Sequence, residues 1–218
     1  MSATSSILNK TTLHNKKLTD YKLVAIDMDG TALNEKYQLN RRTIETIQKV
    51  EDNGLVILLA TGRMLSAVTE HLNLLGTSGL VVSHNGALVK DVHKNQTYLH
   101  NKVLPEVVKT TLLLYEQFKF VLHFNIQDEV FVKHPSTVSK RYAEELGITL
   151  NYSSPSYLDI IENSTSILLM ERKKVLEHVL MQVQATHPNE FDHVLIQDRK
   201  MFGCYNSYLI ILLKEKLF

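Results

Sequence analysis

Short apolar runs alternate with amphipathic stretches between residues 22 and 86. Residues 22–26, 55–59 and 79–82 are rich in consecutive aliphatic side chains, as in strands that are covered on both faces of a sheet. Residues 40–52 and 66–75 instead carry aliphatic side chains every three or four positions, which is the spacing of a helix with one buried face. The order strand, helix, strand, helix, strand predicts a Rossmann-like parallel sheet of the α/β class, joined by right-handed crossovers.

Helix-end signals fall at the borders of these segments. Asn40 is a residue type that caps the first turn of a helix, and Asn53-Gly54 is a pair at which helices stop. Gly76 ends the second predicted helix in the same way, and Gly147 ends a later one. Local chemistry and hydrophobic spacing therefore give the same boundaries.

The pattern changes after Gly86. The predicted helices are residues 104–118, 138–146 and 173–184, and the predicted strands are residues 87–90, 97–99, 120–124, 130–133, 166–170 and 194–197. The first two strands are expected to pair as a hairpin, and the next two as antiparallel neighbours, because only short polar segments separate them. These elements predict an α+β module inserted after the third strand of the core.

The expected organisation has four parts. Residues 1–20 are rich in Ser, Thr, Asn and Lys and lack an apolar block, so a disordered N-terminal tail is expected. Residues 21–86 form the N-terminal part of the core, and residues 87–198 form the inserted module. Residues 199–218 lack the pattern of further core strands and helices, so a divergent tail is expected to replace the rest of an incomplete core.

Three polar clusters lie where the predicted parallel strands end. They are Asp27 to Thr31, Thr61 to Arg63, and Asn85-Gly86. In open α/β sheets the ligand crevice lies beyond the carboxyl ends of the strands. The agreement of three clusters with three strand ends is a stronger signal for a functional site than any one cluster.

The first cluster has the residue types of a phosphoryl-transfer site. Asp27 is placed to attack phosphorus as a carboxylate nucleophile, and Asp29 to act as the acid and base. Gly30 lets the backbone turn close to a ligand, and Thr31 adds a hydroxyl group. Two carboxylates that face an anionic substrate need a hard cation, so Mg²⁺ is the expected cofactor.

These motifs resemble the haloacid dehalogenase-like superfamily, and within it the Cof-type branch of small-molecule phosphatases. Asp27-x-Asp29-Gly30-Thr31 matches the first motif of that family in full, and Thr61 at the end of the next strand matches the second. Asn85-Gly86-Ala87 resembles the entry into the cap domain of the Cof-type branch, which is an inserted module of mixed α/β content. The resemblance covers roughly residues 21 to 200.

The resemblance implies a role for each matched position. Asp27 is the nucleophile and a magnesium ligand, and Asp29 is the acid/base, which gives its backbone carbonyl to magnesium. Thr61 hydrogen-bonds the transferring phosphoryl group, while Gly62 and Arg63 shape or contact the substrate side of the pocket. Asn85 lies near the phosphate or at the hinge of the cap. Each of the last two residues has an alternative interpretation. Arg63 could be an exposed residue at the start of the next helix, and Asn85 could serve only in a structural turn.

The sequence departs from the family beyond the cap. The family pattern then brings a Lys and a Gly-Asp-x-x-Asn-Asp-like segment that completes the magnesium site, and neither is found in residues 198–218. A truncated or alternatively spliced product, or an incorrect gene model, would explain this. Three functions stay open: a phosphatase of small phosphorylated metabolites, possibly sugar phosphates; a catalytically impaired relative that acts at most as a binding or interaction protein; and a phosphosugar mutase.

The composition of the chain limits which partners and compartments are expected. The chain has 24 basic and 23 acidic residues, so no basic excess is available for binding a nucleic-acid backbone. The single cysteine, Cys204, excludes an intrachain disulfide and fits a reducing compartment. No apolar run is long enough to cross a membrane. We expect a cytoplasmic protein that binds a small phosphorylated metabolite, with no nucleic acid and no membrane as partners, and no feature predicts its oligomeric state.

Overall fold

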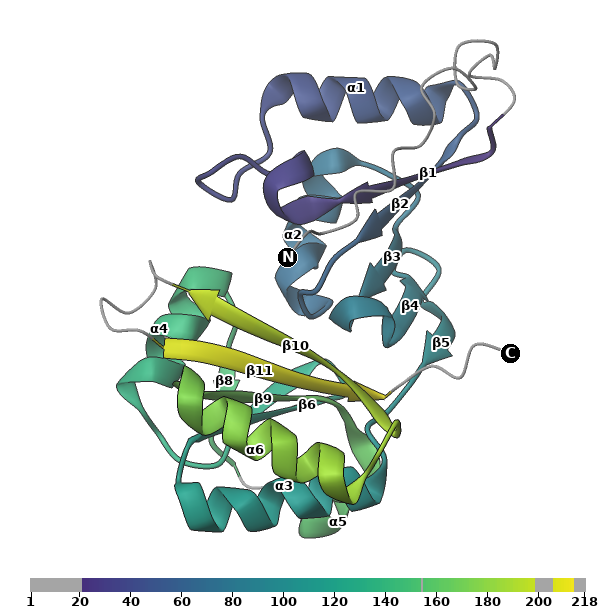
Figure 1. The fold of residues 1–218 in the computed structure, drawn as a ribbon. Helices are drawn as coiled ribbons and strands as arrows, with labels where there is room; N and C mark the ends of the chain where they lie inside the picture. The colour runs from purple at the N-terminus through teal and green to yellow at the C-terminus, as the bar shows by residue number, and fades with distance from the viewer. Residues whose placement is uncertain (1–20, 154, 199–205, 214–218) are drawn as a thin grey trace, which may run out of the picture.

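Two β-sheets with helices packed against them make up the computed structural model of the protein, which describes residues 21–153, 155–198 and 206–213 (Figure 1). The first sheet has the strand order β1 (Leu23–Asp27), β2 (Val56–Ala60), β3 (Leu80–Ser83), β4 (Leu88–Asp91), β5 (Gln96–His100). β1, β2 and β3 are parallel, and β4 and β5 continue the sheet in antiparallel pairing. The predicted Rossmann-like α/β arrangement of the first module is confirmed.

One face of the first sheet is covered by α1 (Arg41–Asp52) and α2 (Ser66–Leu75). Ile47 of α1 and Leu72 of α2 are buried against Ile57 and Leu59 of β2, because the helical spacing of their aliphatic side chains gives each helix one apolar face. On the opposite face, Leu23 is 45% exposed. The prediction that β1 is covered on both faces is therefore wrong at this position.

The second sheet has six strands and is antiparallel except for one pair. Its strand order is β10 (Phe191–Asp198), β11 (Asn206–Leu213), β9 (Ser164–Arg172), β6 (Val121–Ile126), β7 (Glu129–Val132), β8 (Leu150–Asn151). The parallel pair is β7 with β8. The predicted antiparallel pairing of residues 120–124 with 130–133 is confirmed by β6 and β7.

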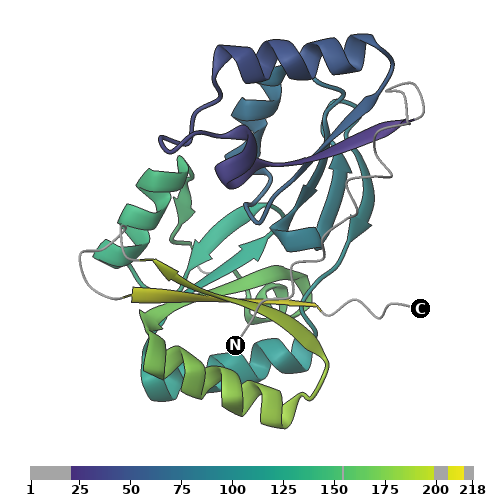
Figure 2. The same ribbon diagram turned by 45° about the horizontal axis from the view of Figure 1, so that its top comes forward.

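Helices lie on both faces of the second sheet, as the two views in Figures 1 and 2 show. α3 (Pro105–Phe118), α5 (Tyr157–Asn163) and α6 (Lys173–Thr186) bury the main apolar cluster of this module, which includes Phe120, Phe124 and Leu169. α4 (Thr137–Leu146) packs on the other face, against Leu168 and Met170. That other face is the one turned toward the first module.

The border between the modules differs from the predicted one. The hairpin of β4 and β5 was expected to open the inserted module after Gly86, yet β4 is hydrogen-bonded to β3 of the first sheet. The strand β11 falls in residues 199–218, expected as a tail that replaces core structure, and it pairs instead between β9 and β10 of the second sheet. By strand pairing, the second module therefore begins after β5 and includes β11.

The predicted helix ends agree with the structure. The side chain of Asn40 accepts a hydrogen bond from the backbone N–H of Thr43 at 2.8 Å, as an N-cap does. Gly76 and Gly147 follow α2 and α4 in the left-handed conformation, each with φ 64°. The expected disordered tail of residues 1–20 lies outside the described residues.

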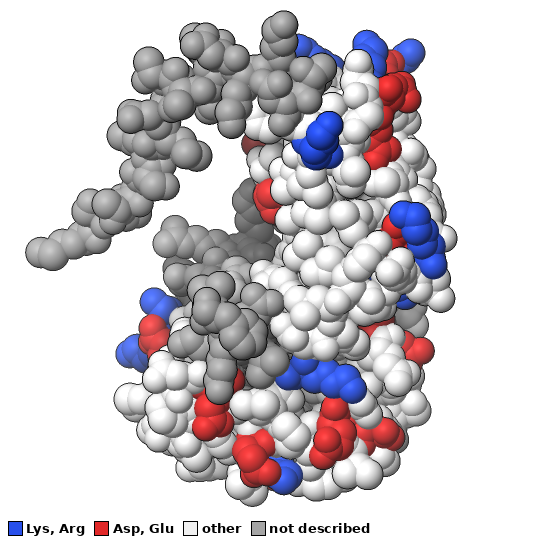
Figure 3. All heavy atoms as spheres, turned by 90° about the vertical axis from the view of Figure 1, so that its right-hand side faces the viewer, with Lys and Arg blue, Asp and Glu red and all other residues white. Residues whose placement is uncertain are grey.

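Charged side chains of both signs are mixed on the face drawn in Figure 3, where Lys and Arg lie among Asp and Glu. No helix within the described ranges has the length and apolar character needed to cross a membrane.

A buried histidine stands out beneath α4. His123 of β6 is fully buried, and its Nε2 lies 2.8 Å from the hydroxyl oxygen of Ser139. Its ring meets the ring of Tyr142 edge-on, with the centroids 5.6 Å apart. Burial lowers the pKa of His123 from 6.5 to about 4, because the charged imidazolium would lose its hydration. The side chain is therefore neutral in the folded protein at pH 7.

This burial predicts a loss of stability in mild acid. Between pH 6.5 and 4 the unfolded chain binds a proton at His123 that the folded chain does not, so the free energy of unfolding falls as the pH falls. From pH 7 to pH 5 the contribution of this group is about 2 kcal/mol. His123→Gln removes this titrating group. The free energy of unfolding of the variant, measured with urea, should therefore depend less steeply on pH than that of the wild type.

The control is His193→Asn, at an exposed position of β10. An identical pH dependence in the wild type and in His123→Gln would contradict the assignment of His123 as a buried neutral group.

Candidate active site

The first polar cluster forms a tight turn at the end of β1. The strand ends at Asp27, and residues 28–32 form a turn that is closed by a hydrogen bond of 2.9 Å from the Leu33 N–H to the Met28 carbonyl. Gly30 has φ 76°, a conformation that a residue with a Cβ adopts at a cost. The hydroxyl of Thr31 donates to Oδ2 of Asp27 at 3.1 Å. Asp27 is thus held at the strand end, while Asp29 lies in the turn.

An ion pair holds the second carboxylate. Nη2 of Arg63 lies 2.7 Å from Oδ1 of Asp29, and Nε of Arg63 lies 3.1 Å from Oδ2, so the guanidinium binds both oxygens. The side chain of Arg63 is only 9% exposed, and its Cζ lies 5.1 Å from the centroid of the Tyr37 ring. The sequence left open whether Arg63 contacts the pocket or is an exposed residue. In the structure it lines the cleft and is not exposed.

One hydrogen bond holds the second cluster together, and a backbone hydrogen bond joins it to the third. The N–H of Arg63 donates to the hydroxyl oxygen of Thr61 at 3.1 Å, and the N–H of Asn85 donates to the carbonyl of Thr61 at 3.2 Å. Asn85 has φ 53°, in the left-handed region that Asn tolerates better than most residues. A Cβ on Gly62 would lie 2.7 Å from Oδ1 of Asn85, so only glycine fits beside this amide as the structure stands.

The strand register explains why the three clusters meet. Asp27 is paired with Ala60, and Ala60 with Val82, so the carboxyl ends of β1, β2 and β3 lie side by side. The loops that follow are therefore neighbours at one edge of the sheet. The expectation that the three clusters come together at this edge is confirmed.

A cleft of about 340 Å³ lies between this edge and the second module. Its lining residues from the first module are Asp29, Tyr37, Gly62, Arg63 and Asn85, and those from the second are Tyr142, Glu145, Leu146, Leu168, Ile196 and Ile210. Asp27 and Thr61 do not line the cleft themselves. Asp27 is exposed at the end of β1, whereas Thr61 is buried.

The wall from the second module was not predicted as part of the site. One signal was present: Tyr142, Glu145 and Leu146 are spaced by three and four positions in a predicted helix, so they share a face. Burial raises the pKa of Tyr142 to about 12, and the Arg63 guanidinium acts in the opposite direction. Its phenol is therefore protonated at neutral pH.

The oxygen groups at the end of β1 fit Mg²⁺ in kind. Mg²⁺ prefers carboxylate and carbonyl oxygens, which Asp27 and Asp29 provide. One or two carboxylates are also a usual number for Mg²⁺, although no cluster of three or more His, Cys, Asp or Glu side chains suited to a metal occurs in the described part of the chain. Two protein ligands leave the remaining positions around the ion to other groups.

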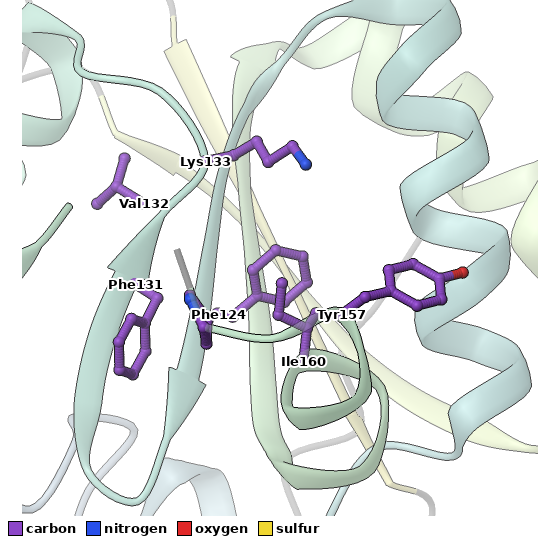
Figure 4. Close-up of a pocket in the computed structure, with 7 residues that line it drawn as sticks. Phe124, Phe131, Val132, Lys133, Tyr157 and Ile160 are labelled. Carbon is purple, nitrogen blue, oxygen red and sulfur yellow. The ribbon is translucent and has the colours of Figure 1, made fainter. Parts of the chain in front are cut away.

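Another cavity lies in the second module, apart from the predicted site (Figure 4). It has a volume of about 110 Å³ and is lined by Phe124, Phe131, Val132, Lys133, Pro155, Tyr157 and Ile160. Phe124 belongs to the cluster covered by α3, α5 and α6, so this cavity opens on the side of the sheet away from the cleft. None of the predicted site residues lines it.

The contact between Gly62 and Asn85 gives a direct test of this geometry. Gly62→Ala should lower the free energy of unfolding by about 1–3 kcal/mol, the usual cost of overpacking, because the new methyl group displaces the Asn85 amide. In an Asn85→Gly background the same change should cost less than half as much, since the amide is gone and glycine accepts φ 53°. Chemical denaturation of the four proteins measures the coupling, and equal costs in both backgrounds would contradict it.

Comparison with known proteins agrees with this geometry. The family model for haloacid dehalogenase-like hydrolases matches residues 24–210. A putative phosphatase of Bacillus subtilis, YxeH, is 38% identical over 79 residues, which is 35% of this chain and 29% of that protein. The 5-amino-6-(5-phospho-D-ribitylamino)uracil phosphatase YitU of the same organism is 24% identical over 178 residues, or 78% of this chain and 64% of that protein. The chain thus spans less than two thirds of each of these curated relatives.

A solved structure shows the same fold. The crystal structure of a haloacid dehalogenase-like hydrolase from Bacteroides thetaiotaomicron superposes with a TM-score of 0.76 at 18% identity, over 89% of this chain and 71% of that one. At this identity the likeness concerns the fold alone. Because the family model spans both modules, from β1 into β11, the chain belongs to the haloacid dehalogenase-like hydrolase family.

Proposed function

We propose that the protein is a phosphatase-type hydrolase that acts on a small phosphorylated metabolite through a carboxylate nucleophile. The observation that carries the proposal is the meeting of Asp27, Asp29, Thr61, Arg63 and Asn85 at one sheet edge that faces a cleft of about 340 Å³. Membership of the family supports it, as do the phosphatase names of the two relatives.

The proposed reaction has two steps. In the first, a carboxylate oxygen of Asp27 attacks phosphorus and the ester P–O bond breaks, while Asp29, protonated and released from one of its two bonds to Arg63, gives its proton to the leaving alkoxide. In the second, Asp29 takes a proton from water, the water oxygen attacks phosphorus, and the bond between phosphorus and Asp27 breaks. The products are the alcohol and inorganic phosphate, and both carboxyl groups return to their starting states.

Arg63 links Asp29 to the substrate in this scheme. Its guanidinium has five N–H donors, of which two groups are used on Asp29 in the structure. Other N–H donors of the same guanidinium can bind a phosphoryl oxygen. A guanidinium matches phosphate in geometry as well as in charge. We assign Arg63 and Asn85 to the substrate side of the site, and the hydroxyl of Thr61 to the phosphoryl group.

Mg²⁺ belongs to the proposal as the cofactor. The carboxylate of Asp27 and the backbone carbonyl of Asp29 would hold it, and it would offset the repulsion between the two carboxylates and the phosphate. Asp29 can serve in this way while its side chain stays on Arg63, because the carbonyl and the carboxylate are separate groups.

The cleft wall limits the substrate by size and polarity. A volume of about 340 Å³ holds a small molecule, and Leu146, Leu168 and Ile210 give much of the wall an apolar surface. Tyr142 and Glu145 supply polar groups on the same wall. A sugar phosphate is a substrate candidate of suitable size, bound through its apolar ring face and through these two groups.

A second candidate function is ligand binding without turnover. It is favoured by the finding that the described residues contain no cluster of three metal-binding side chains. Loss of one electrostatic group from such a site typically costs about 10²–10³ in rate. Binding of orthophosphate in the presence of Mg²⁺, measured by calorimetry and without measurable hydrolysis, would favour this candidate over the enzyme.

Replacement of the nucleophile tests the proposed reaction. Purified protein should hydrolyse para-nitrophenyl phosphate with Mg²⁺, and Asp27→Asn should lower kcat by about 10³-fold or more, because an amide is a poor nucleophile. Asp52→Asn, at the exposed end of α1, is the matched control and should keep the wild-type rate. Full activity in Asp27→Asn would contradict the assignment of Asp27 as the nucleophile.

A further inference from the structure

The hairpin between β6 and β7 ends in a turn with an unusual backbone. Its two connecting residues, Gln127 and Asp128, have φ 52° and 65°. Both values lie in the left-handed region, as in the two-residue hairpin turns that Asn and Gly favour, and neither residue here is Asn or Gly. A tip of this kind aims the side chain of Asp128 in a defined direction.

Asp128 is aimed at the first module. Its Oδ1 accepts a hydrogen bond from the backbone N–H of Leu65 at 2.8 Å and lies 3.6 Å from Nε2 of His84. Its own backbone carbonyl lies 3.5 Å from the hydroxyl of Ser66. Asp128, at the tip of the β6–β7 hairpin, thus contacts two segments of the first module at once.

His84 extends this contact back into the second module. Its side chain is 3% exposed, and its Nδ1 lies 3.3 Å from the hydroxyl oxygen of Ser166 in β9. The amide of Asn125 donates to the same hydroxyl oxygen at 2.7 Å. The imidazole is therefore enclosed between Asp128 and Ser166, both of which belong to the second sheet.

Further charged groups lie at this junction. His100 of β5 is hydrogen-bonded to Thr165 at 2.8 Å, and its pKa is lowered by burial first, and then by Lys102 and His84. Asp128 acts on the pKa of His100 in the opposite sense. Asp128 therefore lies beside His84 and also acts on His100.

Apolar packing supports the same contact. Met64 and Ala67, next to Leu65 in the chain, are buried against Val130 and Val132 of β7. The hairpin tip is thus seated on residues 64–67 through one charged group and a small apolar cluster. This arrangement limits how far the second module can rotate without loss of both kinds of contact.

The two loops that receive Asp128 also carry the site. The N–H of His84 donates to the carbonyl of Arg63 at 2.9 Å, and the N–H of Asn85 donates to the carbonyl of Thr61 at 3.2 Å. A shift of His84 or Leu65 would therefore reach Asn85 or Arg63, which lie one and two residues away along the chain.

We propose that Asp128, acting on Leu65 and His84, is a positioning residue that locks the second module onto the loops of Thr61, Arg63 and Asn85 and so sets the spacing of the cleft. Its effect on turnover rests on the proposed function, whereas its effect on the arrangement of the modules does not. Turnover and module arrangement are therefore measured separately, and either prediction can fail without the other.

The hairpin itself offers a matched pair of variants. Asp128→Gly removes the carboxylate and accepts φ 65°, so the turn is kept while the contacts to Leu65 and His84 are lost. Gln127→Gly relaxes the adjacent position in the same way, and Gln127 is exposed. Asp128→Asn keeps an oxygen acceptor for Leu65 and removes the charge beside His84.

The arrangement of the modules is measured by the distance between spin labels on exposed residues of α1 and α6, in a Cys204→Ser background. We expect Asp128→Gly to broaden or shift the distance distribution, and Gln127→Gly to leave it as in the wild type. An unchanged distribution in Asp128→Gly would overturn the proposal, even if the variant were less stable, because a purely local role in the hairpin predicts that outcome.

Turnover of para-nitrophenyl phosphate is the second readout. Asp128→Gly should lower kcat/KM by about 10-fold to 10²-fold through misplacement of the cleft wall, with Asp128→Asn in between and Gln127→Gly unchanged. A wild-type rate in Asp128→Gly would contradict the role in the reaction. If the wild-type protein itself shows no hydrolysis, the proposed function fails, and the label distances still decide the positioning role.

Discussion

The parallel pairing of β1, β2 and β3 is the constraint on which the candidate site depends. Asp27, Ala60 and Val82 are neighbours across the sheet, and this register brings three loops to one edge although 58 positions of sequence separate Asp27 from Asn85. A shift of one residue in either pair would turn the alternating side chains to the other face of the sheet. The carboxylates and the loops of Thr61 and Asn85 would then no longer face one crevice.

Within this frame, the side chains of the site restrain one another. Arg63 binds both oxygens of Asp29, the ring of Tyr37 lies beside the guanidinium, and Asn85 occupies the space next to Gly62. Charge-assisted hydrogen bonds of this length are stronger than neutral ones, although Asp29 itself is 43% exposed. The ion pair thus gives Asp29 a fixed orientation before any ligand arrives.

The modules meet in two ways that differ in chemistry. At the cleft, the facing surfaces leave about 340 Å³ open between polar loops and a largely apolar wall. At the junction, the β6–β7 tip closes the gap through Asp128 and through the cluster of Met64 and Val130. An open cleft therefore lies beside a closed junction between the same two modules. The predicted border was misplaced, because the pattern of a single strand such as β4 or β11 does not say which sheet the strand joins.

The sequence by itself determined most of the local elements, though not α5, β8 or β11, and it led to the proposed chemistry of the first motif. Helical spacing, Asn40 and the stop at Gly76 were sufficient for α1 and α2, because capping and one-sided burial act over a few neighbouring residues. Only the tertiary structure decided the partners of Arg63 and Asp128. Their contacts cross 34 and 63 positions of the chain, and such distances are closed by sheet register and by the docking of one module on the other, which no local pattern encodes.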